Sequence, residues 1–126
     1  MASSASLITL SFYGSTKVMP NYNVMGVAKA ALETSVKYLS VDLGTKNVRV
    51  NAISAGPMRT LAGAAIANAR DVYKYTEENS SLKRNVLLDE IGNSALYLVS
   101  DLSSAVTGEI HYVDCGFNIV GMPKIK

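Results

Sequence analysis

The chain has 126 residues, a formal net charge of +2 and 48% hydrophobic residues, which suits one small globular domain and excludes a disordered chain. No apolar run approaches the roughly 18 residues of a membrane span, and the start lacks a secretion-signal pattern, so we expect a cytoplasmic protein that does not bind membranes. Basic residues are interleaved with acidic ones, so we do not expect nucleic-acid binding. With one cysteine and one histidine, the chain can form neither an internal disulfide nor a Cys/His zinc site, so we predict no metal.

The first predicted elements are a strand and a long amphipathic helix. Residues 7–10 are a short β-rich apolar run. A helix is expected over residues 22–43, because apolar side chains recur there at steps of three and four positions: Leu32, Val36, Leu39 and Leu43. We expect Asn21 or Asn23 to cap its start and Gly44 to supply the left-handed residue at its end.

The middle of the chain predicts a second strand and then a less regular segment. Residues 48–53 read as a strand, which the Gly-Pro pair at 56–57 stops, because proline has no amide hydrogen for a ladder. Residues 58–85 are less regular. Within them, residues 61–67 are small and apolar and predict a short, mobile helix, weakened by an internal glycine by roughly 1 kcal/mol relative to alanine.

The last predicted elements are a helix and a third strand. Asp89 is the expected cap of a helix with the inner face Ile91, Ala95, Leu98, Val99 and Leu102. Residues 109–114 alternate as a strand. Two crossovers through helices imply parallel strands, so we predict an α/β fold: a partial Rossmann-like doubly wound parallel sheet of three strands with crossover helices, in one domain spanning residues 1–126.

Tyr22 and Lys29 form the candidate catalytic pair. They lie seven positions apart in the predicted helix, and seven residues at about 100° each come within roughly 20° of two full turns, so both side chains would leave one face. A phenol with an ordinary pKa near ~10 is a poor acid until a neighbouring cation stabilises the charge that grows on it. Spacing alone leaves a structural role open for both residues.

Long ordered runs of the sequence resemble one family. The runs are residues 18–22, 51–57, 60–61, 89–95, 100–103, 107–109, 113–114 and 116–117. In them the chain resembles bacterial enoyl-acyl-carrier-protein reductase, the NADH-dependent enzyme of fatty-acid elongation and a divergent short-chain dehydrogenase/reductase. The resemblance covers nearly the whole chain but only the C-terminal half of the family's domain, because the first strand and the glycine-rich turn that receives the pyrophosphate have no counterpart here.

The resemblance implies an NADH site beyond the carboxyl ends of the strands, where ligands bind in such sheets. The corners at this edge are residues 11–14, 54–60 and 114–117. The cofactor-binding residues that the family pattern implies are Lys29, Gly56, Pro57, Met58, Arg59, Thr60, Leu61 and Ala62. Backbone groups of Met58 and the hydroxyl of Thr60 are the groups expected to hydrogen-bond the cofactor.

The implied substrate is a trans-2-enoyl thioester carried on acyl carrier protein. By resemblance, hydride adds to the β-carbon while Tyr22 donates a hydrogen bond to the thioester oxygen, and Lys29 holds the nicotinamide-ribose hydroxyls. The substrate-binding residues implied are Tyr22, Met25, Ala62 and Ile66. The family's basic patch toward the carrier protein is reduced to Arg70, because Ala67 and Asp71 stand where bases are common.

Two positions separate this chain from close alternatives. An ordinary ketoreductase of the superfamily has Tyr four positions before its Lys; Met25 stands there, and a thioether cannot donate a proton. Many reductases of the family have a second tyrosine ten positions before the one that Tyr22 matches, where this chain has Phe12. Tyr13 is adjacent, and we include it among the candidate catalytic residues.

Two further expectations concern assembly. The family is commonly tetrameric, so we expect a homo-oligomer with the helix from Tyr22 as a contact surface. The main alternative is a truncated, inactive fragment, or a subunit that needs its amino-terminal half in trans, since a sheet without the first strands exposes an unpaired edge.

Overall fold

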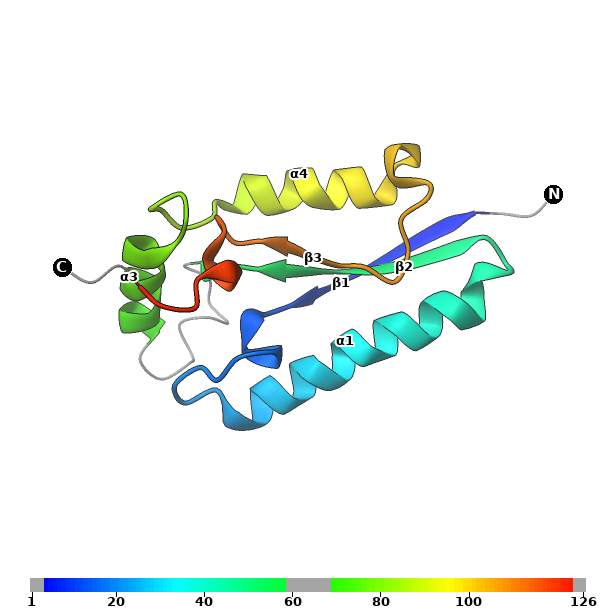
Figure 1. Ribbon diagram of the computed structural model, residues 1–126. Helices are drawn as coiled ribbons and strands as arrows, with labels where there is room; N and C mark the ends of the chain where they lie inside the picture. The colour runs from blue at the N-terminus through cyan, green and yellow to red at the C-terminus, as the bar shows by residue number, and fades with distance from the viewer. Residues whose placement is uncertain (1–3, 59–68, 124–126) are drawn as a thin grey trace.

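The computed structural model describes residues 4–58 and 69–123. In this part of the chain, β1 (Ala5–Ser11), β2 (Val48–Ala55) and β3 (Ile110–Val113) form a parallel sheet in the order β1-β2-β3 (Figure 1). The predicted helix at 61–67 lies outside the described residues. The predicted α/β fold with three parallel strands is confirmed.

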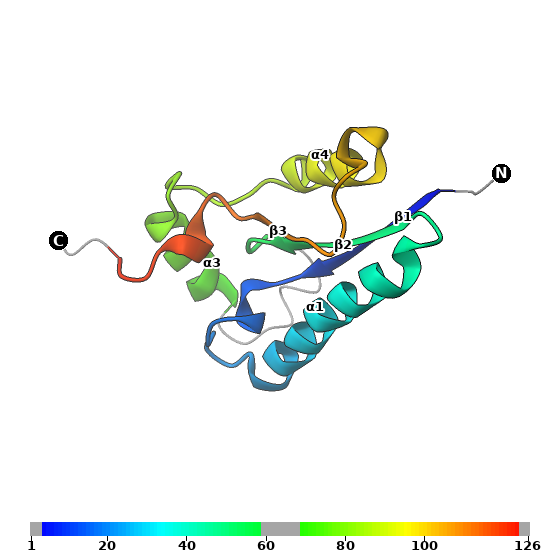
Figure 2. The ribbon, with the colours of Figure 1, turned by 45° about the vertical axis from the view of Figure 1, so that its right-hand side comes forward.

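Two helices cover the two faces of the sheet, α1 (Asn23–Gly44) on one and α4 (Leu88–Val99) on the other (Figures 1 and 2). Alternation along β2 sends side chains to both layers. One apolar cluster joins β2 to α1 through Val36, Val50 and Ala52. The other joins β2 to α4 through Ile53, Ala55, Val86, Ile91 and Leu98. The result is a three-layer α/β/α arrangement.

The three strands follow one another across the sheet in chain order, although the helices that connect them lie on opposite faces. Both crossovers step in the same direction across the sheet, yet the first passes through α1 and the second through α4 on the opposite side. The two crossovers therefore have opposite hands, and one departs from the usual right-handed rule. The second contains an additional helix, α3 (Ala69–Asn79), which lies near the carboxyl ends of the strands.

The predicted caps of the first helix are wrong. Tyr22 is the N-cap residue of α1, with no side-chain cap, so neither Asn21 nor Asn23 caps it. The helix is followed by hydrogen-bonded turns, in which the amide of Asn47 donates to the carbonyl of Gly44, and the left-handed residue is Asn47 (φ 58°) rather than Gly44. Asparagine tolerates this conformation better than most non-glycine residues, which explains the exchange of roles.

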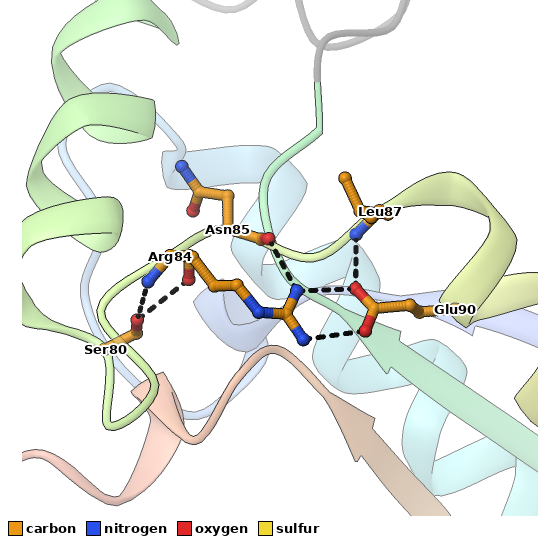
Figure 3. Close-up of polar contacts among 5 residues, drawn as sticks. All are labelled: Ser80, Arg84, Asn85, Leu87 and Glu90. Atoms are coloured by element: carbon orange, nitrogen blue, oxygen red, sulfur yellow. Dashed lines mark hydrogen bonds and ion pairs between the residues drawn. The ribbon is translucent and has the colours of Figure 1, made fainter.

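The start of α4 also differs from the expectation. Leu87 rather than Asp89 is its N-cap residue, and the side chain of Glu90 accepts the amide of Leu87 at 2.8 Å (Figure 3). Glu90 also receives two hydrogen bonds from the guanidinium of Arg84, at 2.7 and 2.8 Å. A carboxylate three residues into the helix satisfies the free amide at its start, and the aspartate in the first turn is left outside the cap.

The predicted inner faces hold only in part. Ile91 and Leu98 are buried, but Val99 is 51% exposed, since it is one step of about 100° beyond Leu98 around the helix. Leu102 is 81% exposed because α4 ends at Val99. Leu39 of α1 is 43% exposed.

The irregular segment predicted at 58–85 contains α3, which the sequence reading missed. None of the described helices is long and apolar enough to cross a membrane.

Candidate active site at the carboxyl ends of the strands

The three strand ends meet at one edge of the sheet, where the start of α1, helix α3 and two short 3-10 turns also lie (Figure 1). A narrow, apolar hollow lies there, too small to admit a water molecule. Its lining comes from all three predicted corners and from two further segments: Phe12, Tyr13, Met19, Gly56, Pro57, Thr76, Asp114 and Phe117.

The aromatic ring of Tyr22 is held in place by two glycines. It is 6% exposed and meets Phe12 edge-on, with the ring centroids 5.1 Å apart. A Cβ on Gly14 would lie 2.8 Å from Cε2 of the ring and still closer to Cδ2. A Cβ on Gly26 would lie 2.9 Å from the carbonyl oxygen of Gly14. Only glycine at these two positions lets the turn after β1 approach the start of α1 so closely.

Burial raises the pKa of the Tyr22 phenol above its ordinary value of 10.0. No hydrogen bond joins its hydroxyl to another residue in the described part of the chain. A phenol with a raised pKa stays protonated at neutral pH. Such a group is suited to donating a hydrogen bond and unsuited to acting as a free base.

Lys29 lies two turns further along α1 and is directed to the end of β1. Its Nζ donates to the backbone carbonyl of Leu10 at 2.9 Å. An ammonium has three donors, and this is the one hydrogen bond that it makes within the described residues. Lys29 thus contacts Leu10 near the end of β1, and Tyr22 contacts Phe12 and Gly14 just after the strand, in agreement with their predicted position on one face of the helix.

Glu33, one turn beyond Lys29, is a site feature that the sequence reading missed. It is 7% exposed, and Ser11, the last residue of β1, is 4% exposed. The hydroxyl of Ser11 donates to Oε2 of Glu33. The only sequence signal for a role of Glu33 was its spacing of four positions from Lys29. Hydrophobic periodicity alone predicts that a glutamate in a helix is solvent-exposed, so it gave no sign that Glu33 is buried.

The ends of β2 and β3 approach closely at Gly56. Its amide donates to the carbonyl of Val113 at 3.0 Å, and a Cβ there would lie 3.0 Å from Cα of Asp114. The buried carboxylate of Asp114 accepts the amides of Gly116 and Asn118, both at 3.0 Å. Asp114 therefore closes the turn after β3, and its side chain is used within the fold.

Tyr13 lies on the β3 side of the hollow. Its ring meets Phe117 edge-on at 5.3 Å, and Phe117 in turn meets Tyr75 of α3 at 6.1 Å. Burial, and then the negative charge of Asp114, raise the pKa of Tyr13 above 10.0. Phe12, and not Tyr13, is the ring that packs on Tyr22.

The other predicted site residues are placed unevenly. Pro57 lines the hollow beside Gly56, and Met58 packs against the apolar cluster under α4. Met25 is 50% exposed on α1. Five predicted cofactor or substrate residues lie outside the described residues: Arg59, Thr60, Leu61, Ala62 and Ile66.

Residues 1–118 match a family model described as Enoyl-(Acyl carrier protein) reductase. The chain belongs to this reductase family. A Rhizobium meliloti (strain 1021) relative, named enoyl-[acyl-carrier-protein] reductase [NADH] 2, is 59% identical over 126 residues, which are 100% of this chain and 47% of the relative. The Rickettsia typhi enzyme named enoyl-[acyl-carrier-protein] reductase [NADH] FabI is 56% identical over 99% of this chain and 48% of its own length.

Solved structures of the reductase family agree with the fold. The crystal structure of FabI from Candidatus Liberibacter asiaticus has a TM-score of 0.94 and 62% identity, over 98% of this chain and 48% of that one. The reductase of Anaplasma phagocytophilum, solved in complex with NAD, has a TM-score of 0.89 and 57% identity, over 95% of this chain and 46% of that one. The chain spans about half the length of the curated relatives that it matches.

Proposed function

We propose that the chain carries the Tyr22/Lys29 half of an NADH-dependent enoyl-acyl-carrier-protein reductase, which reduces the trans-2 double bond of an enoyl thioester in fatty-acid biosynthesis. The reductases that it resembles at 56–59% identity bear this name. The observation that supports the proposal is that Lys29 and Tyr22 both contact the segment 10–14, Lys29 at Leu10 and Tyr22 at Phe12 and Gly14, with the phenol hydroxyl unbonded to other described residues.

Two features of this edge support a nicotinamide dinucleotide site. Lys29 keeps donors in reserve for ribose hydroxyls, and the close approach at Gly56 leaves no side chain on the end of β2. Backbone groups from Gly56 onward, with Thr60 by resemblance, would hold the remainder. When bound, NADH supplies the hydride that adds to the β-carbon of the enoyl group.

Tyr22 then acts on the substrate oxygen. As charge moves onto the thioester carbonyl oxygen, the protonated phenol donates a hydrogen bond that strengthens with that charge. A preorganised donor of this kind is worth about 3 kcal/mol of barrier, or about two orders of magnitude in rate. The phenol of Tyr22, whose pKa burial raises above 10.0, is in the donor form at neutral pH, as this role requires.

Partner and assembly follow as parts of the same proposal. The substrate arrives on acyl carrier protein, and the protein is a cytoplasmic homo-oligomer. The outer face of α1 supports the assembly, because four large apolar side chains there are between 73% and 79% exposed: Val24, Val27, Tyr38 and Val41. Apolar side chains exposed in a row favour a contact with another subunit.

A second candidate is a chain that is inactive by itself and works only with the other half of the reductase. Two observations favour it. The chain spans about half the length of its relatives. Leu7 and Leu10 on β1 are 48% and 51% exposed, and in the described part of the chain β1 pairs only with β2. An unpaired strand edge of this kind is a docking edge for another strand.

One steady-state assay tests both candidates. NADH oxidation that depends on an enoyl thioester is measured for the chain alone and for the chain co-expressed with the amino-terminal half of the Rhizobium meliloti reductase. Activity of the chain alone supports the first candidate, and activity only on complementation supports the second. In the active preparation, Tyr22→Phe should lower kcat at least about tenfold, and Tyr97→Phe, at an exposed position of α4, should not. Full activity of Tyr22→Phe would exclude the proposed role.

A further inference from the structure

One face of α1 holds the end of β1 residue by residue. Residues at steps of four, three and four positions along the helix meet the segment 10–14, and an interval of eleven residues comes within about 20° of three full turns. Tyr22 packs on Phe12 and Gly14, and Lys29 donates to the carbonyl of Leu10. The four members of this row are Tyr22, Gly26, Lys29 and Glu33.

Glu33 is the buried charge of the row. Its carboxylate is almost withdrawn from water and accepts the hydroxyl of Ser11. Ser54 is paired with Ser11 in the register of β1 and β2, is 1% exposed, and its hydroxyl has no partner among the described residues. Glu33 thus lies among hydroxyls in a layer that is otherwise filled by apolar side chains such as Val36. Burying a carboxylate is unfavourable, and an apolar side chain would fill this space without that penalty.

The ammonium of Lys29 depends on the segment that Glu33 holds. In the described part of the chain, no ion pair joins Lys29 to Glu33, although they are four residues apart on one helix. The ammonium is held by the carbonyl of Leu10, and Leu10 directly precedes Ser11, which Glu33 binds. A shift of Ser11 would therefore move the acceptor on which Lys29 rests.

We propose that Glu33 is a positioning residue: by binding the hydroxyl of Ser11 it fixes the end of β1, and through the Leu10 carbonyl it holds the ammonium of Lys29 where the cofactor needs it. The last clause rests on the proposed function, since it takes Lys29 as the cofactor-binding residue. The first does not, because the placement of Lys29 can be measured in the chain by itself.

The placement is tested by carbon-13 NMR of labelled lysine in the full 126-residue chain, with the ε-carbon signal of Lys29 assigned by Lys29→Arg. In Glu33→Ala this signal should move toward the position of a solvated lysine. Glu33→Gln keeps an acceptor for Ser11 and should leave the signal in place. Asp42→Ala removes an exposed carboxylate from the same helix and should also leave it in place. An unmoved signal in Glu33→Ala overturns the proposal.

A second variant removes the same hydrogen bond from the other side, so the test remains decisive if Glu33→Ala does not fold. Ser11→Ala removes only the hydroxyl that Glu33 binds, and it should move the Lys29 signal in the same direction as Glu33→Ala. If Glu33→Ala does not fold, an unmoved signal in Ser11→Ala overturns the proposal. Circular dichroism at the temperature of measurement confirms that each compared variant keeps its helices.

The kinetic consequence is tested in the complemented reductase. Glu33→Ala should raise KM for NADH by about fivefold or more, Glu33→Gln should stay within about twofold of the parent, and a purely structural loss would lower kcat with KM unchanged. If the Lys29 signal moves and KM does not, the cofactor clause is refuted. If the unmutated preparation is inactive, the proposed function fails, and the NMR result still decides whether Glu33 positions Lys29.

Discussion

Gly14→Ala is the most direct perturbation of the geometry that places Tyr22. The added methyl carbon would lie 2.8 Å from Cε2 of the Tyr22 ring and closer to Cδ2, whereas carbon atoms in contact are normally about 3.5–4.0 Å apart. The ring must therefore move by about 1 Å. Phe12 packs edge-on against it and the ring is 6% exposed, so it has little room to move.

Two magnitudes follow from this overlap. Overpacking of a filled site costs about 1–3 kcal/mol, and in a domain of this size each kcal/mol lowers the melting temperature by roughly 4 °C, so the expected fall is about 4–12 °C. A displacement of about 1 Å at a catalytic group can reduce the rate about 100-fold. The loss of activity should therefore exceed what the loss of folded protein explains.

The assay pairs thermal unfolding with enoyl-thioester-dependent NADH oxidation in the complemented enzyme. Gly92→Ala is the matched control. Gly92 is a solvent-exposed residue within α4, and a Cβ there would meet nothing within 4 Å. The substitution should therefore stabilise the protein by about 0.5–1 kcal/mol and leave the rate unchanged. If Gly14→Ala melts at the temperature of the parent and keeps its rate, the close approach of Gly14 does not place the ring, and the reasoning is refuted.

Two further predictions concern polar groups elsewhere in the fold. Hydrogen bonds from Arg84 and from the amide of Leu87 lower the pKa of Glu90 from 4.5 to about 2. The Arg84–Glu90 pair stabilises the folded state fully above pH 4.5, and this contribution is lost as pH falls toward 2. The unfolding midpoint of Glu90→Gln should therefore change less between these pH values than that of the parent. Equal changes in the two proteins would contradict the assignment. Ser54→Ala removes a buried hydroxyl that has no partner and should be neutral or stabilising by up to about 1 kcal/mol in denaturant titration, whereas Ser11→Ala leaves Glu33 without its donor and should cost about 1–3 kcal/mol. Equal losses for the two serine variants would show that Ser54 has a partner, such as a bound water.

The regular elements could be predicted from the sequence because their signals are local. The apolar run of β1, the alternation of β3 and the three- and four-residue spacing of α1 each depend on residues within a few positions, and all three elements form where expected. The caps could not be predicted in the same way. Whether Asn21, Tyr22 or Asn23 begins the helix depends on how the turn after β1 packs on it, which is a tertiary contact.

The residues of the candidate site also differ in whether local sequence could predict them. The spacing of Tyr22 and Lys29 is local, and the structure brings both to one end of β1. Gly14 and Glu33 were missed for different reasons. The need for a glycine at position 14 appears only when the Tyr22 ring lies against it. Glu33 is buried only because a serine hydroxyl on a separate strand receives it, and a pattern of apolar residues carries no such information.

The central place of β2 has a consequence for motion. Its backbone is bonded along both edges, and its side chains from Val50 to Ala55 are buried beneath α1 on one side and α4 on the other. Amide protons of this strand can exchange with solvent only when both layers separate, so it should be the last part of the chain to open. The floor of the candidate site is thus attached to the slowest-opening segment, while α1, which carries the candidate residue Lys29, can loosen without breaking the strand.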